Sequence, residues 1–411
     1  MTKRSNVSKL YVPEPPFRPG DKPDFSHIVV PAEHSPSRPD PMVDAYDTEP
    51  QATGLVRVLK LDGEATGDWN PNLNADTLRE GLRHMLLTRL VDDRMFSMQR
   101  QGKLSFYMKS TGEEAVAVAT AMAVRPTDMV FPTYRQQGIL MARGWELKKL
   151  MCQCLSNAGD PLEGRSIPVL YSVREKGFFS VSGNLGTQMI QAVGWGMACA
   201  YRGNDDIAIA FTGEGASAEG DFHYALNFAS TYRAPVILNV VNNQWAISSF
   251  QGIAAGQSKS FASRGLSWGL ASLRVDGNDF LAVYAAMQWA AERARRGGGA
   301  TVVEFFTYRK EGHSTSDDPT KYRPRSEPDA WPFGDPIGRL TDHLIKLGEW
   351  DEKRHEALID ELKVFVRETY KEAEALGTLA TPSNINPATM FEEVFEETPS
   401  HLRRQRQEFG V

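Results

Sequence analysis

The chain has 411 residues, with 52 acidic and 46 basic side chains and a formal net charge of -6. This length accommodates one large α/β domain with extensions, and the acidic balance gives no basis for nucleic-acid binding. No run of about 18 apolar residues exists, so we expect no transmembrane helix. Three cysteines are too few for a disulfide framework, and we interpret Cys152, Cys154 and Cys199 as reduced, buried packing residues.

Residues 1–75 are rich in Pro, Asp and Ser, as in the runs PEPPFRP and HSPSRPDP. This composition predicts an extended N-terminal arm, with a hairpin near residues 55–62, rather than a packed core. Arms of this kind cover a partner subunit or stay mobile. No apolar segment follows Lys3 and Arg4, so no secretory signal is predicted.

Residues 76–325 carry an α/β pattern, and residues 326–411 read as a charged, helical C-terminal extension. A strongly amphipathic stretch predicts a helix at 76–99. The run Ser110-Thr111-Gly112-Glu113 matches a capping box before a small-residue helix at 115–124. Gly194-Trp195-Gly196 indicates close helix packing. The basic run at 403–406 is interpreted as a solvated surface.

Short apolar runs bounded by polar residues are typical of buried parallel strands. They predict strands at 207–212, 235–241, 273–275 and 302–307, with helices at 217–230 and 280–295. The fold class is therefore α/β, with a mostly parallel sheet and helices on both of its faces.

The most informative motif follows two of these strands. Gly213-Glu214-Gly215 comes directly after the first, and Asn242-Asn243 comes directly after the second. Open α/β sheets bind ligands at the carboxyl ends of their strands. A carboxylate and an amide oxygen are hard ligands, and Mg²⁺ takes a few of these together with phosphate and water oxygens. The motif therefore predicts a Mg²⁺-bridged diphosphate.

The GEG…NN pattern resembles the thiamin-diphosphate motif, which usually reads GDG followed by NN. Four further segments agree: SFYMKSTGEEA at 105–115, YRQQG at 134–138, SGNLGTQ at 182–188 and GHSTSDD at 312–318. Together they resemble the α subunit of the E1 component of 2-oxoacid dehydrogenase complexes, and more closely the branched-chain enzymes. The resemblance covers about residues 55–404 and implies the thiamin-diphosphate-binding fold.

The resemblance assigns roles to particular residues. Glu214 and Asn243 would bind Mg²⁺ through their side chains, and Trp245 through its main-chain carbonyl. His313 would be catalytic and would also contact the cofactor phosphate. Ser314 corresponds to a serine that is phosphorylated in mitochondrial members. The remaining cofactor-binding residues would be Tyr134, Arg135, Gly183, Leu185, Gly213, Gly215, Ala216 and Arg309, and the acyl pocket would be lined by Phe106, Tyr107 and Tyr134.

The loop at 182–188 allows two interpretations. Ser182, Asn184, Thr187 and Gln188 resemble a monovalent-cation loop, and hydroxyl and carbonyl oxygens suit K⁺. A capped turn before a helix explains the same residues, and both interpretations stay open. The chain also departs from animal relatives, which carry Ser-Ser-Pro in this loop and an arginine where Val241 stands. The loss of that arginine predicts a weaker grip on the diphosphate or a substitute cation elsewhere.

The resemblance implies an enzyme that is active only with a β subunit, as an α2β2 heterotetramer. It would decarboxylate branched-chain 2-oxoacids such as 3-methyl-2-oxobutanoate and acylate the lipoyl group of E2. The glutamate that contacts the cofactor pyrimidine would come from the β subunit, since we find room for only one α/β domain. The location would be cytoplasmic in a bacterium and the mitochondrial matrix in a eukaryote.

Other functions remain open. The chain could be the E1 α subunit for pyruvate or acetoin, because one methylene in an apolar pocket discriminates by only about 1–3 kcal/mol. A non-catalytic nucleotide-binding or scaffold protein is the remoter alternative. The absence of a GxxxxGK[ST] loop argues against an NTPase.

Overall fold

The computed structural model describes residues 11–26, 28, 35–382, 386–392 and 395–411. Its centre is a sheet of five parallel strands in the order β1-β2-β3-β7-β6. The strands are β1 (Met129–Phe131), β2 (Ala208–Gly213), β3 (Val236–Asn242), β6 (Ala271–Asp276) and β7 (Thr301–Phe306). The predicted strands are all present, and the parallel sheet is confirmed.

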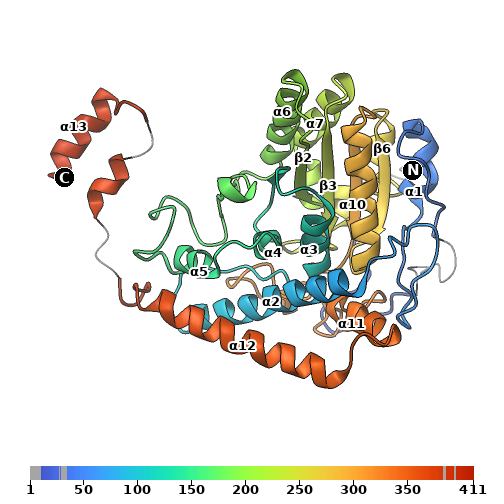
Figure 1. Ribbon diagram of the computed structural model, residues 1–411, viewed down its shortest axis with the longest axis horizontal. Helices are drawn as coiled ribbons and strands as arrows, with labels where there is room; N and C mark the ends of the chain where they lie inside the picture. Colours follow the sequence, from blue (N-terminus) through green and yellow to red (C-terminus); the bar gives the residue numbers. More distant parts are fainter. Residues whose placement is uncertain (1–10, 27, 29–34, 383–385, 393–394) are drawn as a thin grey trace, which may run out of the picture.

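Helices cover both faces of this sheet, because alternate strand residues point to opposite sides. Ile209 and Phe211 of β2 belong to the larger core cluster, which also contains residues of α2 (Ala75–Arg100), α3 (Glu114–Ala123) and α10 (Phe280–Arg295). Ala208 and Ala210 belong to a second cluster, formed with α6 (Thr187–Tyr201) and α7 (Gly220–Thr231). Figure 1 shows α3 and α10 on one side of the strands and α6 and α7 on another. The predicted arrangement of helices on both faces is confirmed.

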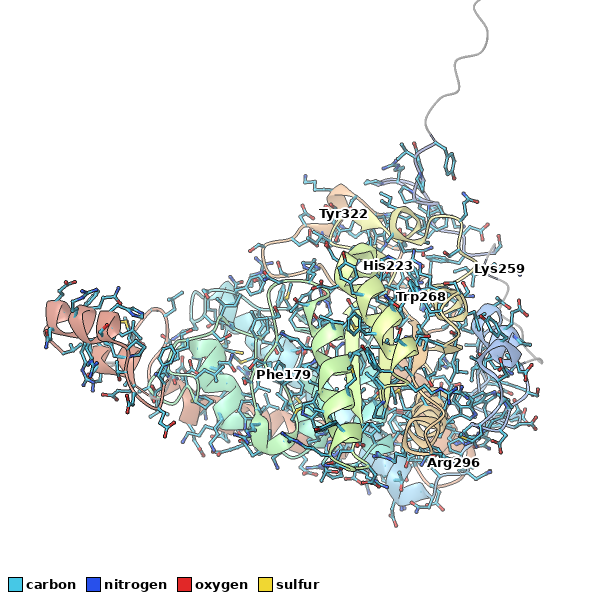
Figure 2. The ribbon with its side chains drawn as sticks, turned by 90° about the horizontal axis from the view of Figure 1, so that it is seen from above. Phe179, His223, Lys259, Trp268, Arg296 and Tyr322 are labelled. Atoms are coloured by element: carbon cyan, nitrogen blue, oxygen red, sulfur yellow. The ribbon has the colours of Figure 1, made fainter. Side chains whose placement is uncertain are left out.

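Figure 2 looks onto the face that α6 and α7 cover, where the two green helices lie side by side between the labelled Phe179 and Trp268. Several large apolar side chains stay exposed there, among them Tyr224 and Phe228 of α7. The α7 helix starts at Gly220, after a 3-10 turn η3 (Gly215–Ala218), so its predicted start at residue 217 was three residues early.

The capping box predicted before α3 is wrong. Neither Ser110 nor Glu113 caps the helix; Glu113 stands at the N-cap position without a side-chain bond to the first turn. Ser110 instead donates its hydroxyl to the buried carboxylate of Asp92, 2.8 Å away in α2. The Glu113 side chain instead accepts a hydrogen bond from the side-chain amide of Asn243. Tertiary partners therefore replaced the local capping interaction that the spacing predicted.

The described part of the predicted N-terminal arm packs on its own chain. Phe25 meets the ring of Trp331 edge-on, with 5.4 Å between the ring centroids. The carbonyls of Pro36 and Pro39 accept hydrogen bonds from the indoles of Trp69 and Trp289, both at 2.8 Å. Val56 then forms a parallel bridge with Val275, which extends the sheet beyond β6. The hairpin near residues 55–62 corresponds to a tight turn closed by the antiparallel bridge between Leu59 and Ala65. Short helices η1 (Ala45–Thr48) and α1 (Glu49–Thr53) precede it.

From Pro336 onward the described chain is mainly helical. The α11 helix (Pro336–Lys346) and the long α12 helix (Glu352–Glu374) pack against α2, and α13 (Ser400–Phe409) lies apart from the body in Figure 1. Smaller elements complete the fold: α4 (Gln137–Ala142), α5 (Leu147–Leu155), η2 (Arg174–Lys176), β4 (Trp245–Ala246), β5 (Ser249–Phe250), α8 (Gly252–Ala255), α9 (Ser263–Leu266), η4 (Pro319–Lys321) and η5 (Pro387–Phe391).

Close packing in α6 depends on one of the two predicted glycines. A Cβ on Gly196 would lie 3.1 Å from the carbonyl oxygen of Pro235, whereas Gly194 faces open space. The three cysteines are free and buried, as predicted. Within the described ranges, none of the helices is both long and apolar enough to cross a membrane.

Candidate functional site

A cavity of about 360 Å³ lies where β2 and β3 end, at the carboxyl edge of the sheet. It gathers residues from loops that are far apart in the sequence. The predicted site residues that line it are Tyr134, Arg135, Gly183, Leu185, Gln188, Gly213, Glu214, Gly215, Ala216, Asn243, Trp245, Arg309 and His313. Most of the predicted site therefore meets in one place.

The register of the sheet brings Glu214 and Asn243 together. Gly213 pairs with Val241, so the residues that follow each strand emerge side by side. The backbone N–H of Asn243 donates to Oε2 of Glu214 at 3.4 Å, and Oε1 of Glu214 is buried without a hydrogen-bond partner. Burial raises the pKa of Glu214 to about 7, and the carboxylate of Glu113 adds to the shift. An orphaned carboxylate oxygen of this kind suits a bound cation.

Gly215 is required by close approach rather than by backbone conformation. A Cβ at this position would lie 2.3 Å from the Cβ of Ala246, so any larger residue would push β4 away from the strand end. The glycine thus keeps the segment after β3 beside Glu214.

The main-chain carbonyl of Trp245, the third predicted Mg²⁺ ligand, faces Arg309. Arg309 Nη1 donates to this carbonyl at 2.6 Å, and its Nη2 donates to the carbonyl of Ile247 at 2.9 Å. The Trp245 side chain packs inside, with its indole donating to Glu327 at 3.0 Å. A carbonyl oxygen carries two lone pairs, so one remains for a cation. Burial, reinforced by the neighbouring Arg135, lowers the pKa of Arg309.

Arg135 and His313 line the cavity and contact each other. Arg135 Nη2 lies 3.1 Å from Nδ1 of His313 and donates to its carbonyl at 2.6 Å. Burial, then Arg135 and then Arg309, lower the pKa of His313 to about 3, so the imidazole is neutral at pH 7. Because an arginine can only donate, Nδ1 must accept, and the proton belongs on Nε2. The Tyr134 ring meets the imidazole edge-on, 5.7 Å between centroids.

Only some residues of the loop at 182–188 line the cavity. Gly183, Leu185 and Gln188 line the cavity, whereas Ser182, Asn184 and Thr187 do not. The Ser182 hydroxyl accepts from the backbone of Asn184, and the Thr187 hydroxyl donates to Asp221 at 3.0 Å. Gln188 donates to the carbonyl of Phe211, and its own side-chain oxygen is buried without a partner. A K⁺ role for this loop stays a prediction.

Two predicted substrate contacts lie away from the cavity. Tyr107 is fully buried, and its hydroxyl donates to Asp92 at 2.8 Å, so it is committed to the core. Phe106 is half-buried at the edge of the same core. Neither lines the cavity, which argues against direct contact with a substrate there; of the three aromatic residues, only Tyr134 does.

The structure also adds residues that the sequence did not single out. Glu113 and Glu219 line the cavity, and Glu113 contacts Asn243 directly. The sequence feature that could have indicated Glu113 is the pair of adjacent carboxylates, Glu113 and Glu114, before an apolar helix. On the sequence alone, Glu113 is interpreted as part of a capping box instead. The guanidinium groups of Arg135 and Arg309 both line this cavity.

Comparison with known proteins assigns the class. The family described as dehydrogenase E1 component matches residues 82–381. The N-terminal part, residues 7–46, matches the family described as 2-oxoisovalerate dehydrogenase E1 alpha subunit N terminal. The chain therefore belongs to the dehydrogenase E1 component family, on its alpha-subunit side.

The relatives narrow the family further. The 2-oxoisovalerate dehydrogenase subunit alpha of Pseudomonas aeruginosa is 57% identical over 403 residues, which covers 98% of both chains. The mitochondrial alpha subunit of Mus musculus is 38% identical over 355 residues, covering 86% of this chain and 79% of its own. Alpha subunit 2 of Arabidopsis thaliana is 37% identical, covering 78% and 67%. The predicted branched-chain E1 alpha family is confirmed.

Proposed function

We propose that this chain is the subunit that binds the Mg²⁺-diphosphate end of thiamin diphosphate in a branched-chain 2-oxoacid dehydrogenase. The assembled enzyme decarboxylates 3-methyl-2-oxobutanoate and passes the acyl group to a lipoyl group on E2. The observation that carries this proposal is the orphaned Oε1 of Glu214, buried beside Asn243 at the strand ends. Family membership and the names of the relatives support the choice of cofactor and substrate.

The residues divide the work of binding. Glu214, the Asn243 amide oxygen and the Trp245 carbonyl are the candidate Mg²⁺ ligands, and their donor set of three oxygens suits this hard cation. Arg135 and Arg309 supply charge-assisted hydrogen bonds for the diphosphate oxygens. His313 remains neutral and presents Nε2–H as a further donor. Bound thiamin diphosphate supplies a carbanion at its thiazolium ring and the electron sink for decarboxylation.

The cavity needs a second subunit to close it. Leu185 and Ile247 line it, yet they are 47% and 53% exposed, which leaves apolar surface open to water at the mouth. Desolvation strengthens electrostatic interactions with a bound diphosphate. We therefore assign closure of the cavity to the β subunit in an α2β2 assembly, which also supplies the carboxylate that contacts the cofactor pyrimidine.

The first test is cofactor binding by the assembled enzyme. Glu214→Ala removes the orphaned carboxylate and should abolish Mg²⁺-dependent binding of thiamin diphosphate in titration calorimetry. Glu219→Ala is the matched control, because this carboxylate lines the same cavity but is exposed to solvent. Tight Mg²⁺-dependent binding by the Glu214→Ala enzyme would refute the chelation assignment.

The substrate is tested on the same preparation. Turnover of 3-methyl-2-oxobutanoate should exceed that of pyruvate and should require both thiamin diphosphate and Mg²⁺. A preference for pyruvate would retain the family and change the substrate assignment. No turnover by an intact assembly with both cofactors would contradict the catalytic role.

A further inference from the structure

The asparagine at the candidate cation site has an orientation problem. Its side chain ends in one oxygen and one nitrogen of similar size, and only the oxygen can bind a cation. The side-chain oxygen of Asn243 accepts a hydrogen bond from the backbone N–H of Trp245 at 3.3 Å, which is a long contact between residues close in sequence. That contact alone holds the amide poorly, so another group must decide which end faces the site.

Glu113 is in position to decide it. Its Oε1 accepts a hydrogen bond from Nδ2 of Asn243 at 2.7 Å, between residues 130 positions apart in the chain. A carboxylate can only accept, so it admits the nitrogen end of the amide and rejects the oxygen end. The oxygen of Asn243 is thereby directed away from Glu113 and left for the cation.

Glu113 also lies near the guanidinium group of Arg135, which lines the cavity. Nε of Arg135 lies 3.9 Å from the same Oε1, and both side chains are at least 96% buried. The adjacent Glu114 turns the other way and pairs with Arg89 at 2.7 Å. Of the two neighbouring carboxylates, only Glu113 lines the cavity, while Glu114 joins α3 to α2.

We propose that Glu113 is a positioning residue that fixes the amide of Asn243 with its oxygen toward the bound divalent cation. The inference rests on the proposed function, because it presupposes that Asn243 is a cation ligand. Glu113 itself does not bind the cation; it acts through Asn243. Partners in this outer position typically change metal affinity about 10–100-fold when they are removed.

The test measures Mn²⁺ binding, as a paramagnetic substitute for Mg²⁺, to the assembled enzyme with thiamin diphosphate by electron paramagnetic resonance. Glu113→Leu fills the space but accepts no hydrogen bond, and it should weaken Mn²⁺ binding about 10-fold or more. Glu113→Gln keeps an acceptor oxygen but can also offer its nitrogen, so it should weaken binding less. Raising Mg²⁺ should restore turnover in both variants.

Glu304→Gln is the matched control. Glu304 accepts from the amide of Asn242 at 2.9 Å, the same pairing one residue earlier, but it does not line the cavity. Its replacement should lower the melting temperature and leave Mn²⁺ affinity unchanged. Unchanged Mn²⁺ affinity in both Glu113 variants would overturn the inference.

The effect of Glu113→Gln on Mn²⁺ affinity should change sign when Asn243 is replaced by aspartate. This comparison distinguishes an orienting role of Glu113 from a general packing role, and it does not depend on assembly of the Glu113→Leu enzyme. A carboxylate has oxygen at both ends and needs no orienting, so in an Asn243→Asp background Glu113→Gln should strengthen Mn²⁺ binding by removing a like charge. Weakening in both backgrounds would overturn the inference. Glu214→Ala, measured in parallel, distinguishes failure of the proposed cation site from failure of the positioning role of Glu113. Normal Mn²⁺ binding by Glu214→Ala would refute the cation site itself.

Discussion

At the scale of single residues, the site is governed by what burial does to charge. His313 lies between two guanidinium groups in a largely buried position, and the pKa of its imidazole falls to about 3. A neutral imidazole can accept from Arg135 and still offer Nε2–H to a ligand. A protonated one would add a third positive charge to a wall that already holds two.

This shift makes the stability of the chain sensitive to acid. An unfolded histidine titrates near pH 6.5. Between that pH and about pH 3 the unfolded state binds more protons at His313 than the folded state. Its contribution to stability is therefore complete above pH 6.5 and is lost as the pH falls toward 3.

The measurement is a pair of melting curves. Between pH 7 and 5 the melting temperature of the parent chain should fall more steeply than that of His313→Gln, whose side chain does not titrate. Parallel pH profiles would contradict the assignment of a neutral, buried His313.

At the scale of elements, largely buried ion pairs connect three helices to the loop that carries Arg309. Arg89 of α2 pairs with Glu114 at the start of α3 and with Asp335, which caps α11. Asp335 also pairs with Lys310, the neighbour of Arg309, at 3.1 Å. The cluster thus fixes the loop after β7 relative to three helices of the larger core, α2, α3 and α11.

Breaking this cluster should be costly. Glu114→Gln keeps the size of the side chain but removes a fully buried charge that pairs with Arg89, and it should destabilise the fold by about 2–3 kcal/mol. The loss stays at this size because Asp335 still pairs with Arg89. Arg83→Ala removes the exposed ion pair between α2 and Glu361 of α12 and should cost less than about 1 kcal/mol. Urea unfolding measures both, and equal losses would contradict the structural role assigned to the cluster.

At the scale of the whole molecule, the proposed function makes this chain the supplier of one half of a site that the β subunit completes. The residues proposed to bind the diphosphate converge from the sheet edge and from loops, while the mouth of the cavity keeps apolar side chains exposed. Cofactor that binds only the folded, assembled protein stabilises it by mass action, by about 2.7 kcal/mol at 100 times the dissociation constant.

The isolated chain should consequently show little gain in melting temperature with Mg²⁺ and thiamin diphosphate, and no turnover. Co-expression with the β subunit should restore both, and ATP should have no effect on either preparation. Turnover by the purified chain alone would contradict the shared site.

The fold and the meeting of Glu214 with Asn243 follow from the sequence pattern, because short apolar runs reveal parallel strands whose carboxyl ends share one edge. GEG and NN lie at the ends of adjacent strands, so their meeting was predictable. The other site residues were predicted only from the family resemblance. Only the tertiary structure decided the role of Glu113, since a buried carboxylate takes whichever donor the fold presents, here 130 residues away. It likewise committed Tyr107 to Asp92 and aimed Arg309 at the Trp245 carbonyl, because such long-range pairings leave no periodic trace in a sequence.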